Sequence, residues 1–135
     1  MSYYIATNVE GPFTEALTRV EAALSQEGFG VLTRIDIEAT LKTKIGAAFR
    51  PYVILGACNP NLAFDALKLE DKVGTMLPCN IVVQQHQDGR IEVAAVDPVA
   101  SMQAIDNIAL LRAAEQVREK LGRVIASLGS SQASD

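Results

Sequence analysis

The chain has 135 residues, the size of one domain, and its 49% hydrophobic content is enough to build a core at this length. A formal net charge of -4 excludes the basic surface that nucleic-acid binding normally requires, so nucleic acid is not an expected partner. The N-terminus has no signal-peptide pattern, and no apolar run reaches the roughly 18 residues that a membrane span needs. We therefore expect a cytoplasmic protein with reduced thiols, unless the protein itself makes them redox-active.

The first half of the chain predicts strands alternating with helices. Apolar residues spaced by three and four predict the first helix, with a proline in its first turn and a glycine after its end. In chain order we expect a strand at Tyr3–Asn8, a helix from Pro12 to Gly28, a strand at Gly30–Asp36, a short or irregular helix at Ile37–Ile45, a strand at Tyr52–Ala57 and a helix from Asn59 to about Lys68.

The second half contains the clearest hairpin, Asn80–Gln87 and Arg90–Val96, joined by Asp88-Gly89 as a two-residue turn. Asp97-Pro98 ends the second arm, and a long amphipathic helix is expected at Ile105–Leu128. The Ser-rich residues 129–135 have no apolar anchor, so we expect a single domain at residues 1–128 followed by a disordered tail.

The order strand, helix, four strands, helix predicts an α+β fold in two layers, with helices packed on one face of an antiparallel sheet. In the expected hairpin register both faces are apolar. Helices on one face leave the other to a partner or an extra segment, which favours a homodimer. The two sets are Val82, Ile91 and Val93 on one face and Ile81, Val83 and Val96 on the other.

Two near-mirror tripeptides, Cys58-Asn59-Pro60 and Pro78-Cys79-Asn80, contain both cysteines of the chain. Each lies at the end of an apolar run, and antiparallel pairing of those two strands would bring the cysteines together. A two-residue turn pairs Gln87 with Arg90, which places Asp97 opposite Asn80. The sequence therefore predicts one site made of Cys58, Asn59, Pro60, Pro78, Cys79, Asn80 and Asp97.

The two thiols allow either reactive or structural roles. Cys58 directly precedes the expected helix cap, where free N–H groups can lower a thiol pKa, so Cys58 is the better nucleophile and Cys79 the resolving partner. Asp97 opposes this, because a carboxylate destabilises a thiolate, and it is better used as a hydrogen-bond acceptor that orders the loop. The alternative is that both cysteines are packing residues beside turn-forming Asn and Pro.

Metal binding is a weaker use of these residues. Cys58, Cys79 and Asp97 supply three ligands, but His86 lies roughly 20 Å along the strand from Cys79 and no fourth ligand is evident. We therefore expect no metal and no other cofactor. A small basic cluster, Lys42, Lys44 and Arg50, could hold an anion, yet it lies at the far end of the strand from Cys58 and is typical of a solvated face.

Nearly the whole chain resembles the domain of unknown function 302 family. The resemblance rests on five segments, Gly30–Asp36, Thr40–Lys42, Pro51–Pro60, Leu77–Asn80 and Val96–Pro98, which include the Ala-Cys-Asn-Pro and Leu-Pro-Cys-Asn motifs. It implies a curved antiparallel sheet similar to the TATA-binding-protein repeat, and a homodimer. The resemblance transfers no DNA binding, because a fold does not determine function and this chain is acidic.

Three functions remain open at this point. The first is a thiol-dependent redox or sulfur-handling protein that uses Cys58 and Cys79 with a thiol partner. The second is a non-enzymatic module that binds a small molecule between sheet and helix, with the Cys-Asn segments at the rim. The third is an interaction protein whose sheet serves dimerisation.

Overall fold

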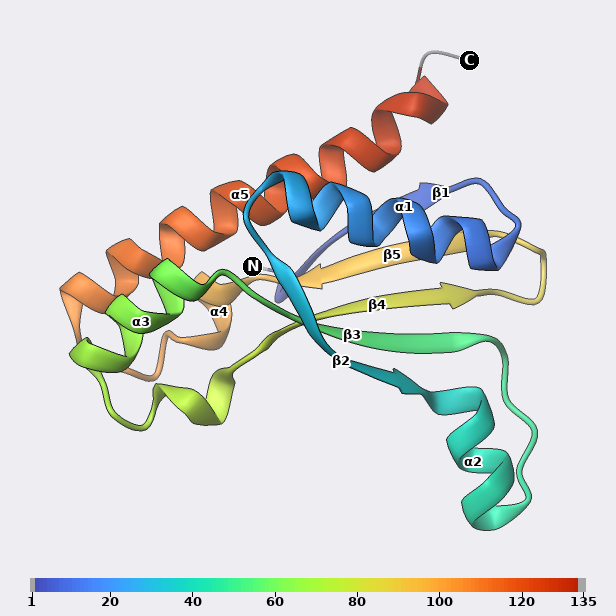
Figure 1. The fold of residues 1–135 in the computed structure, drawn as a ribbon, viewed down its shortest axis with the longest axis horizontal. Helices are drawn as coiled ribbons and strands as arrows, with labels where there is room; N and C mark the ends of the chain where they lie inside the picture. The colour runs from blue at the N-terminus through green and yellow to red at the C-terminus, as the bar shows by residue number, and fades with distance from the viewer. Residues whose placement is uncertain (1, 134–135) are drawn as a thin grey trace.

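The computed structural model describes residues 2–133, with side chains up to Gly129. Its centre is one antiparallel sheet of five strands in the order β1-β5-β4-β3-β2 (Figure 1). The strands are β1 Tyr4–Val9, β2 Gly30–Asp36, β3 Tyr52–Cys58, β4 Cys79–Gln85 and β5 Ile91–Val96. The predicted α+β class with an antiparallel sheet is confirmed.

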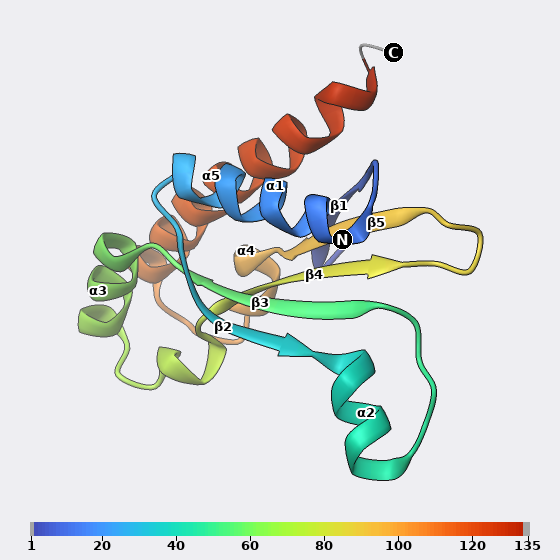
Figure 2. The ribbon, with the colours of Figure 1, turned by 45° about the vertical axis from the view of Figure 1, so that its right-hand side comes forward.

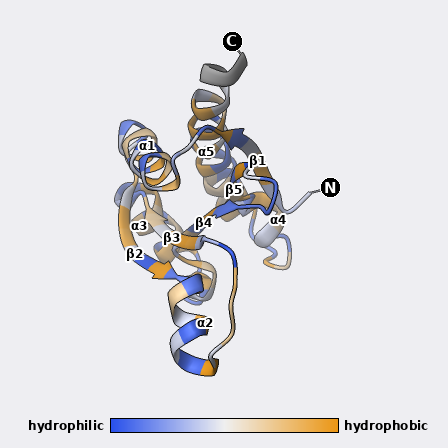
Figure 3. Cartoon of the chain, turned by 90° about the vertical axis from the view of Figure 1, so that its right-hand side faces the viewer, coloured by the Kyte–Doolittle hydropathy of each residue, from blue (hydrophilic) through white to orange (hydrophobic). Residues whose placement is uncertain are grey.

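Two long helices, α1 and α5, cover one face of the sheet, while α2 projects from the opposite side beyond the end of β2 (Figures 1 and 3). Helices α3 and α4 and a 3-10 helix lie at the other end of the sheet, below the start of α5 (Figure 2). The helices are α1 Phe13–Gln26, α2 Ile37–Ile45, α3 Pro60–Leu69, the 3-10 helix Val73–Met76, α4 Pro98–Ser101 and α5 Ile108–Ala133.

The core has two parts. The larger lies between the sheet and helices α1 and α5, and the smaller is an apolar cluster of α3, the 3-10 helix, α4 and the start of α5. Leu24, Leu55, Ile81 and Leu121 of the larger part are fully buried. Because apolar area removed from water is the main favourable term in folding, the face that α1 and α5 cover carries most of the stability.

The hairpin turn is one residue longer than predicted. His86 N–H donates to Arg90 O at 2.8 Å, and Gly89 N–H donates to His86 O at 2.9 Å, so the loop contains Gln87, Asp88 and Gly89. Gly89 has a φ of +90°, the conformation that closes a three-residue hairpin loop. Asp88 Oδ1 accepts from Arg90 N–H at 2.9 Å. The predicted Asp88-Gly89 two-residue turn is therefore wrong.

A shift of one residue changes which side chains share a face, because strand side chains alternate. Gln85 pairs with Ile91, and Ile81 pairs with Ala95. The four large residues Ile81, Val83, Ile91 and Val93 therefore all lie on the covered face, where each is at most 2% exposed. The predicted assignment of these residues to the two faces was therefore wrong, because Ile81 and Val83 share a face with Ile91 and Val93, and Val82 lies on the other.

The uncovered side, which we call the open face, has its own apolar row across the middle of the sheet. Cross-strand pairing aligns Ile35 with Ile54, Ile54 with Val82, Val82 with Ala94 and Ala94 with Ala6. Polar side chains of Gln84, Glu92 and Asn8 form the next row. The open face is thus amphipathic, whereas the middle of the covered face is apolar.

Helix α5 begins at Ile108 and continues to Ala133, whereas the sequence predicted a helix from Ile105 to Leu128 and a disordered tail from residue 129. Asn107 Oδ1 accepts from Leu110 N–H at 3.0 Å and fixes the start. Gly129 does not end the helix: a Cβ placed there would lie 2.4 Å from Thr7 Oγ1, so glycine allows α5 to approach β1 closely. Residues 134 and 135 of the expected tail lie outside the described residues.

Candidate functional site

Both cysteines line one apolar cleft between the end of the sheet and helices α3 and α5. Cys79 pairs with Ala57 across β3 and β4, and Cys58 is the next residue along β3. The cleft encloses about 30 Å³. The other residues that line this thiol cleft are Phe29, Ala57, Asn59, Leu62, Ala63, Ala66, Leu77, Pro98, Met102, Leu110, Ala113, Ala114 and Val117.

Asn59 fixes the rim of the thiol cleft. As the N-cap of α3 its Oδ1 accepts from Leu62 N–H at 3.3 Å, while its Nδ2 donates to Glu27 O at 3.3 Å. The side chain thus joins the start of α3 to the end of α1. The predicted cap at Asn59, with Pro60 in the first turn of the helix, is confirmed.

The electrostatics of the cleft favour a neutral thiol at Cys79. Cys79 is 7% exposed, whereas Cys58 is half-buried. Burial, and secondarily the neighbouring Cys58, raises the pKa of Cys79 from 9.0 to about 11. None of the residues that line the cleft is charged, so no cation is positioned there to stabilise a thiolate. Cys79 is therefore a poor attacking thiol near neutral pH.

Asp97 orders the loop after β5. Its buried Oδ1 accepts from Val99 N–H at 3.0 Å and Ala100 N–H at 3.4 Å, which caps α4. Its Oδ2 lies 3.2 Å from Arg118 Nε on α5. The expected role as a loop-ordering acceptor agrees with this geometry. The predicted pairing with Asn80 does not, because the true register places residue 97 on the strand face of Cys79.

Two further members of the predicted site lie on the open face. A Cβ on Gly56 would approach Pro78 Cγ to 2.8 Å and Asn80 Oδ1 to 3.6 Å, so both side chains pack beside that glycine. Asn80 is exposed there and lines a separate hollow with Tyr4 and Tyr52. The predicted seven-residue site therefore divides: Cys58, Asn59 and Cys79 line the thiol cleft, Pro60 begins α3, Asp97 caps α4, and Pro78 and Asn80 lie across the sheet from the cleft.

Among residues 2–133, no group of three or more Cys, His, Asp or Glu residues is arranged to hold a metal ion. No helix in that range is both long and apolar enough to cross a membrane.

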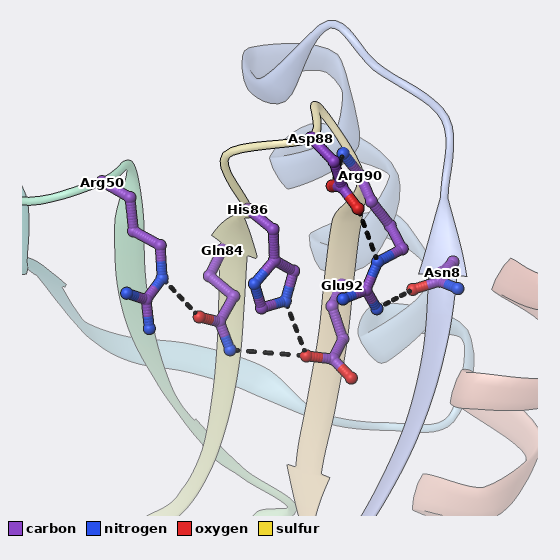
Figure 4. A network of polar contacts seen from close by, with 7 residues as sticks. All are labelled: Asn8, Arg50, Gln84, His86, Asp88, Arg90 and Glu92. Carbon is purple, nitrogen blue, oxygen red and sulfur yellow. Dashed lines mark hydrogen bonds and ion pairs between the residues drawn. The ribbon is translucent and has the colours of Figure 1, made fainter.

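The sequence did not reveal a polar network on the open face (Figure 4). It links Arg50, Gln84, Glu92 and His86, because Gln84 and Glu92 pair directly across β4 and β5. In the register expected from a two-residue turn, Gln84 would face Val93 instead. Only a three-residue loop pairs Gln84 with Glu92, so the polar pattern becomes visible in the sequence once that loop length is assumed.

The comparisons with known proteins agree with the sequence resemblance. The family described as Domain of unknown function DUF302 matches residues 5–128. A crystal structure of an uncharacterized conserved protein DUF302 from Bacillus stearothermophilus superposes with a TM-score of 0.88 at 30% sequence identity, covering 95% of this chain and 99% of that one. No curated protein matches the chain significantly. The likeness to the TATA-binding-protein repeat stays a prediction.

Proposed function

The chain belongs to the DUF302 family, whose description specifies no activity, and from the geometry we propose that it is a non-enzymatic module that binds a small apolar molecule in the thiol cleft. One observation carries this proposal: the cleft between sheet and helices is lined almost wholly by apolar side chains, with Cys58 and Asn59 half-buried beside it. Concave apolar sites with a few convergent polar groups are the usual form of small-molecule sites.

The cleft must widen to admit a ligand. At about 30 Å³ it has room for only one or two waters, whereas ligand sites are usually about 300 Å³ or more. Small side chains face it from both helices, Ala63 and Ala66 from α3 and Ala113 and Ala114 from α5. A modest separation of α3 from α5 therefore opens the space without displacing large core residues.

Titration with benzene, followed by amide NMR shifts, tests the proposal. We expect shifts confined to residues around the cleft, such as Cys58, Ala63 and Ala114. Ala63→Leu fills the half-buried rim and should weaken benzene binding at least tenfold, whereas Ala126→Leu, on an exposed position of α5, should leave it unchanged. The proposal fails if saturating benzene shifts no cleft amide in the wild-type protein.

The thiol-dependent alternative, with Cys58 as nucleophile and Cys79 as resolving thiol, is favoured by the position of half-buried Cys58 directly before the N-cap of α3. The raised pKa of Cys79 opposes its resolving role. Iodoacetamide labelling at pH 7, with each cysteine identified by mass spectrometry, separates the two functions. Fast labelling of Cys58 that Cys58→Ser abolishes and Cys79→Ser preserves supports the thiol function. Equal, slow labelling of both cysteines would contradict the thiol function and favour the binding module.

We also propose that the protein is a cytoplasmic homodimer. The apolar row on the open face, with Ile54, Val82 and Ala94 at its centre, supports a second copy as the partner, because an isologous interface uses the same patch twice. Cytosolic redox buffers would keep both thiols reduced. A dimeric mass by light scattering at micromolar concentration is expected, and Val82→Lys should make it monomeric; a monomeric wild-type mass contradicts the dimer.

A further inference from the structure

Arg50 is held by a chain of hydrogen bonds across the open face. Its Nε donates to Gln84 Oε1 at 2.8 Å, and Gln84 Nε2 donates to Glu92 Oε1 at 3.5 Å. His86 Nε2 lies 3.1 Å from the same Glu92 oxygen. Figure 4 shows the four side chains projecting from one face, with the guanidinium of Arg50 at the outer end of the chain.

Gln84 separates the positive charge of Arg50 from the negative charge of Glu92. Because Glu92 requires a donor and Arg50 an acceptor, the amide of Gln84 has one satisfactory orientation, with its oxygen toward the guanidinium. In the part of the chain with described side chains, no carboxylate lies within ion-pair distance of Arg50, whereas Arg34, Arg90, Arg118 and Arg123 each have one. The two terminal nitrogens of Arg50 can therefore still donate hydrogen bonds to an anion.

Aromatic rings hold the guanidinium of Arg50 in place. Its Cζ lies 4.4 Å from the ring centroid of Phe49 and 5.7 Å from that of Tyr52. Contact with aromatic faces and a fixed Nε hydrogen bond reduce the freedom of an otherwise flexible side chain. Less conformational entropy is then lost when a ligand binds.

Arg50 borders an open hollow of about 680 Å³. The other residues that line it are Ala48, Phe49, His86 and Gln87, so none of the lining residues is acidic. His86 is engaged by Glu92 through Nε2. An adjacent hollow is lined by Glu38 and Lys42, and Ala48 and Phe49 line both hollows.

We propose that this hollow binds the oxyanion group, carboxylate or phosphate, of a small molecule. The planar guanidinium of Arg50 donates two N–H groups to two oxygens of the anion, the geometry in which arginine binds carboxylate and phosphate most strongly. The site lies at the opposite end of β3 from the thiol cleft and is independent of the function proposed for it. Phe49 at its wall favours a ligand whose anion is attached to an aromatic or apolar body.

Amide NMR titrations with phenylphosphate and with benzoate test the site and distinguish the two anions. We expect shifts in residues 48–50 and 86–87 with one or both ligands, and Arg50→Gln should weaken binding at least tenfold. Arg34→Gln is the matched control: it removes the same charge from an exposed ion pair and should leave affinity within twofold.

Gln84→Glu provides a second variant that keeps Arg50. The new carboxylate would pair with the guanidinium in the position of the amide oxygen, so binding should again fall at least tenfold. The proposal is overturned if neither ligand shifts these amides in the wild-type protein, or if Gln84→Glu binds as well as wild type. Amide spectra of both variants first establish that they are folded.

Discussion

The covered and open faces of the sheet are made by alternate residues of the same strands, yet they differ in what they carry. On β3, Val53 and Leu55 point under α1 and α5 and are at most 3% exposed, whereas Tyr52 and Ile54 face the open side and are half-buried. Helix coverage, and not strand composition alone, makes one face a core. The open face, which no helix covers, carries a polar network and open hollows.

Truncation of one residue on each face of β3 should give the largest contrast. Leu55→Ala removes a fully buried side chain and should lower the free energy of unfolding by about 3 kcal/mol, whereas Ile54→Ala should lower it by about 1 kcal/mol. Urea denaturation of both variants, at a protein concentration low enough for the monomer, measures the difference. Equal losses there would mean that Ile54 packs as tightly as Leu55 within one chain.

The alkaline pH dependence of stability should come from the covered side. Because burial raises the pKa of Cys79 to about 11, the folded protein keeps a proton that the unfolded chain loses from about pH 9 upward. The contribution of this thiol is complete below pH 9 and declines between pH 9 and 11, by at most about 2.7 kcal/mol at 1.36 kcal/mol per pKa unit.

Unfolding free energies measured at pH 8, 9, 10 and 11 check this decline. Subtracting the profile of Cys79→Ala from that of wild type removes the titration of lysines and tyrosines. Cys58→Ser leaves the burial of Cys79 in place and should keep most of the wild-type decline. A flat difference between wild type and Cys79→Ala would show that Cys79 is solvated in the folded protein.

Carboxylates on the two faces should differ by a smaller amount. Asp97 is 3% exposed, caps α4 and pairs with Arg118, so Asp97→Ala should cost about 2 kcal/mol of stability. Glu92 is about one quarter exposed on the open face, and Glu92→Ala should cost less than about 1 kcal/mol. Thermal denaturation ranks the two variants, and the reverse order would contradict the assignment of Asp97 as structural.

Sequence patterns predicted the order and kind of nearly all elements because the apolar periods are long and regular. The helix cap at Asn59 and the convergence of Cys58 and Cys79 on one end of the sheet were also predictable, since both follow from local motifs and antiparallel pairing. The Asp88-Gly89 turn was not: a dipeptide fits two- and three-residue loops alike, and hydrogen bonds of His86 and Arg90 decide between them.

The difference of one residue in the length of the hairpin loop changed several parts of the predicted site. It moved Asp97 from beside Asn80 to the strand face of Cys79, and it concealed the pairing of Gln84 with Glu92. The role of Gly129 was equally inaccessible, because close approach of α5 to Thr7 is a tertiary contact with no local signal. Errors in register thus propagate to function, whereas errors in helix length do not.

The asparagine amides at the ends of α3 restrict how that helix can move. Asn59 ties its first turn to Glu27 O, and Asn107 Nδ2 donates to Leu69 O at 3.2 Å at its last turn. Because Asn107 also caps the start of α5, moving all of α3 away from α5 would break the hydrogen bond at its last turn. Opening of the thiol cleft is therefore opposed by a specific hydrogen bond as well as by apolar packing.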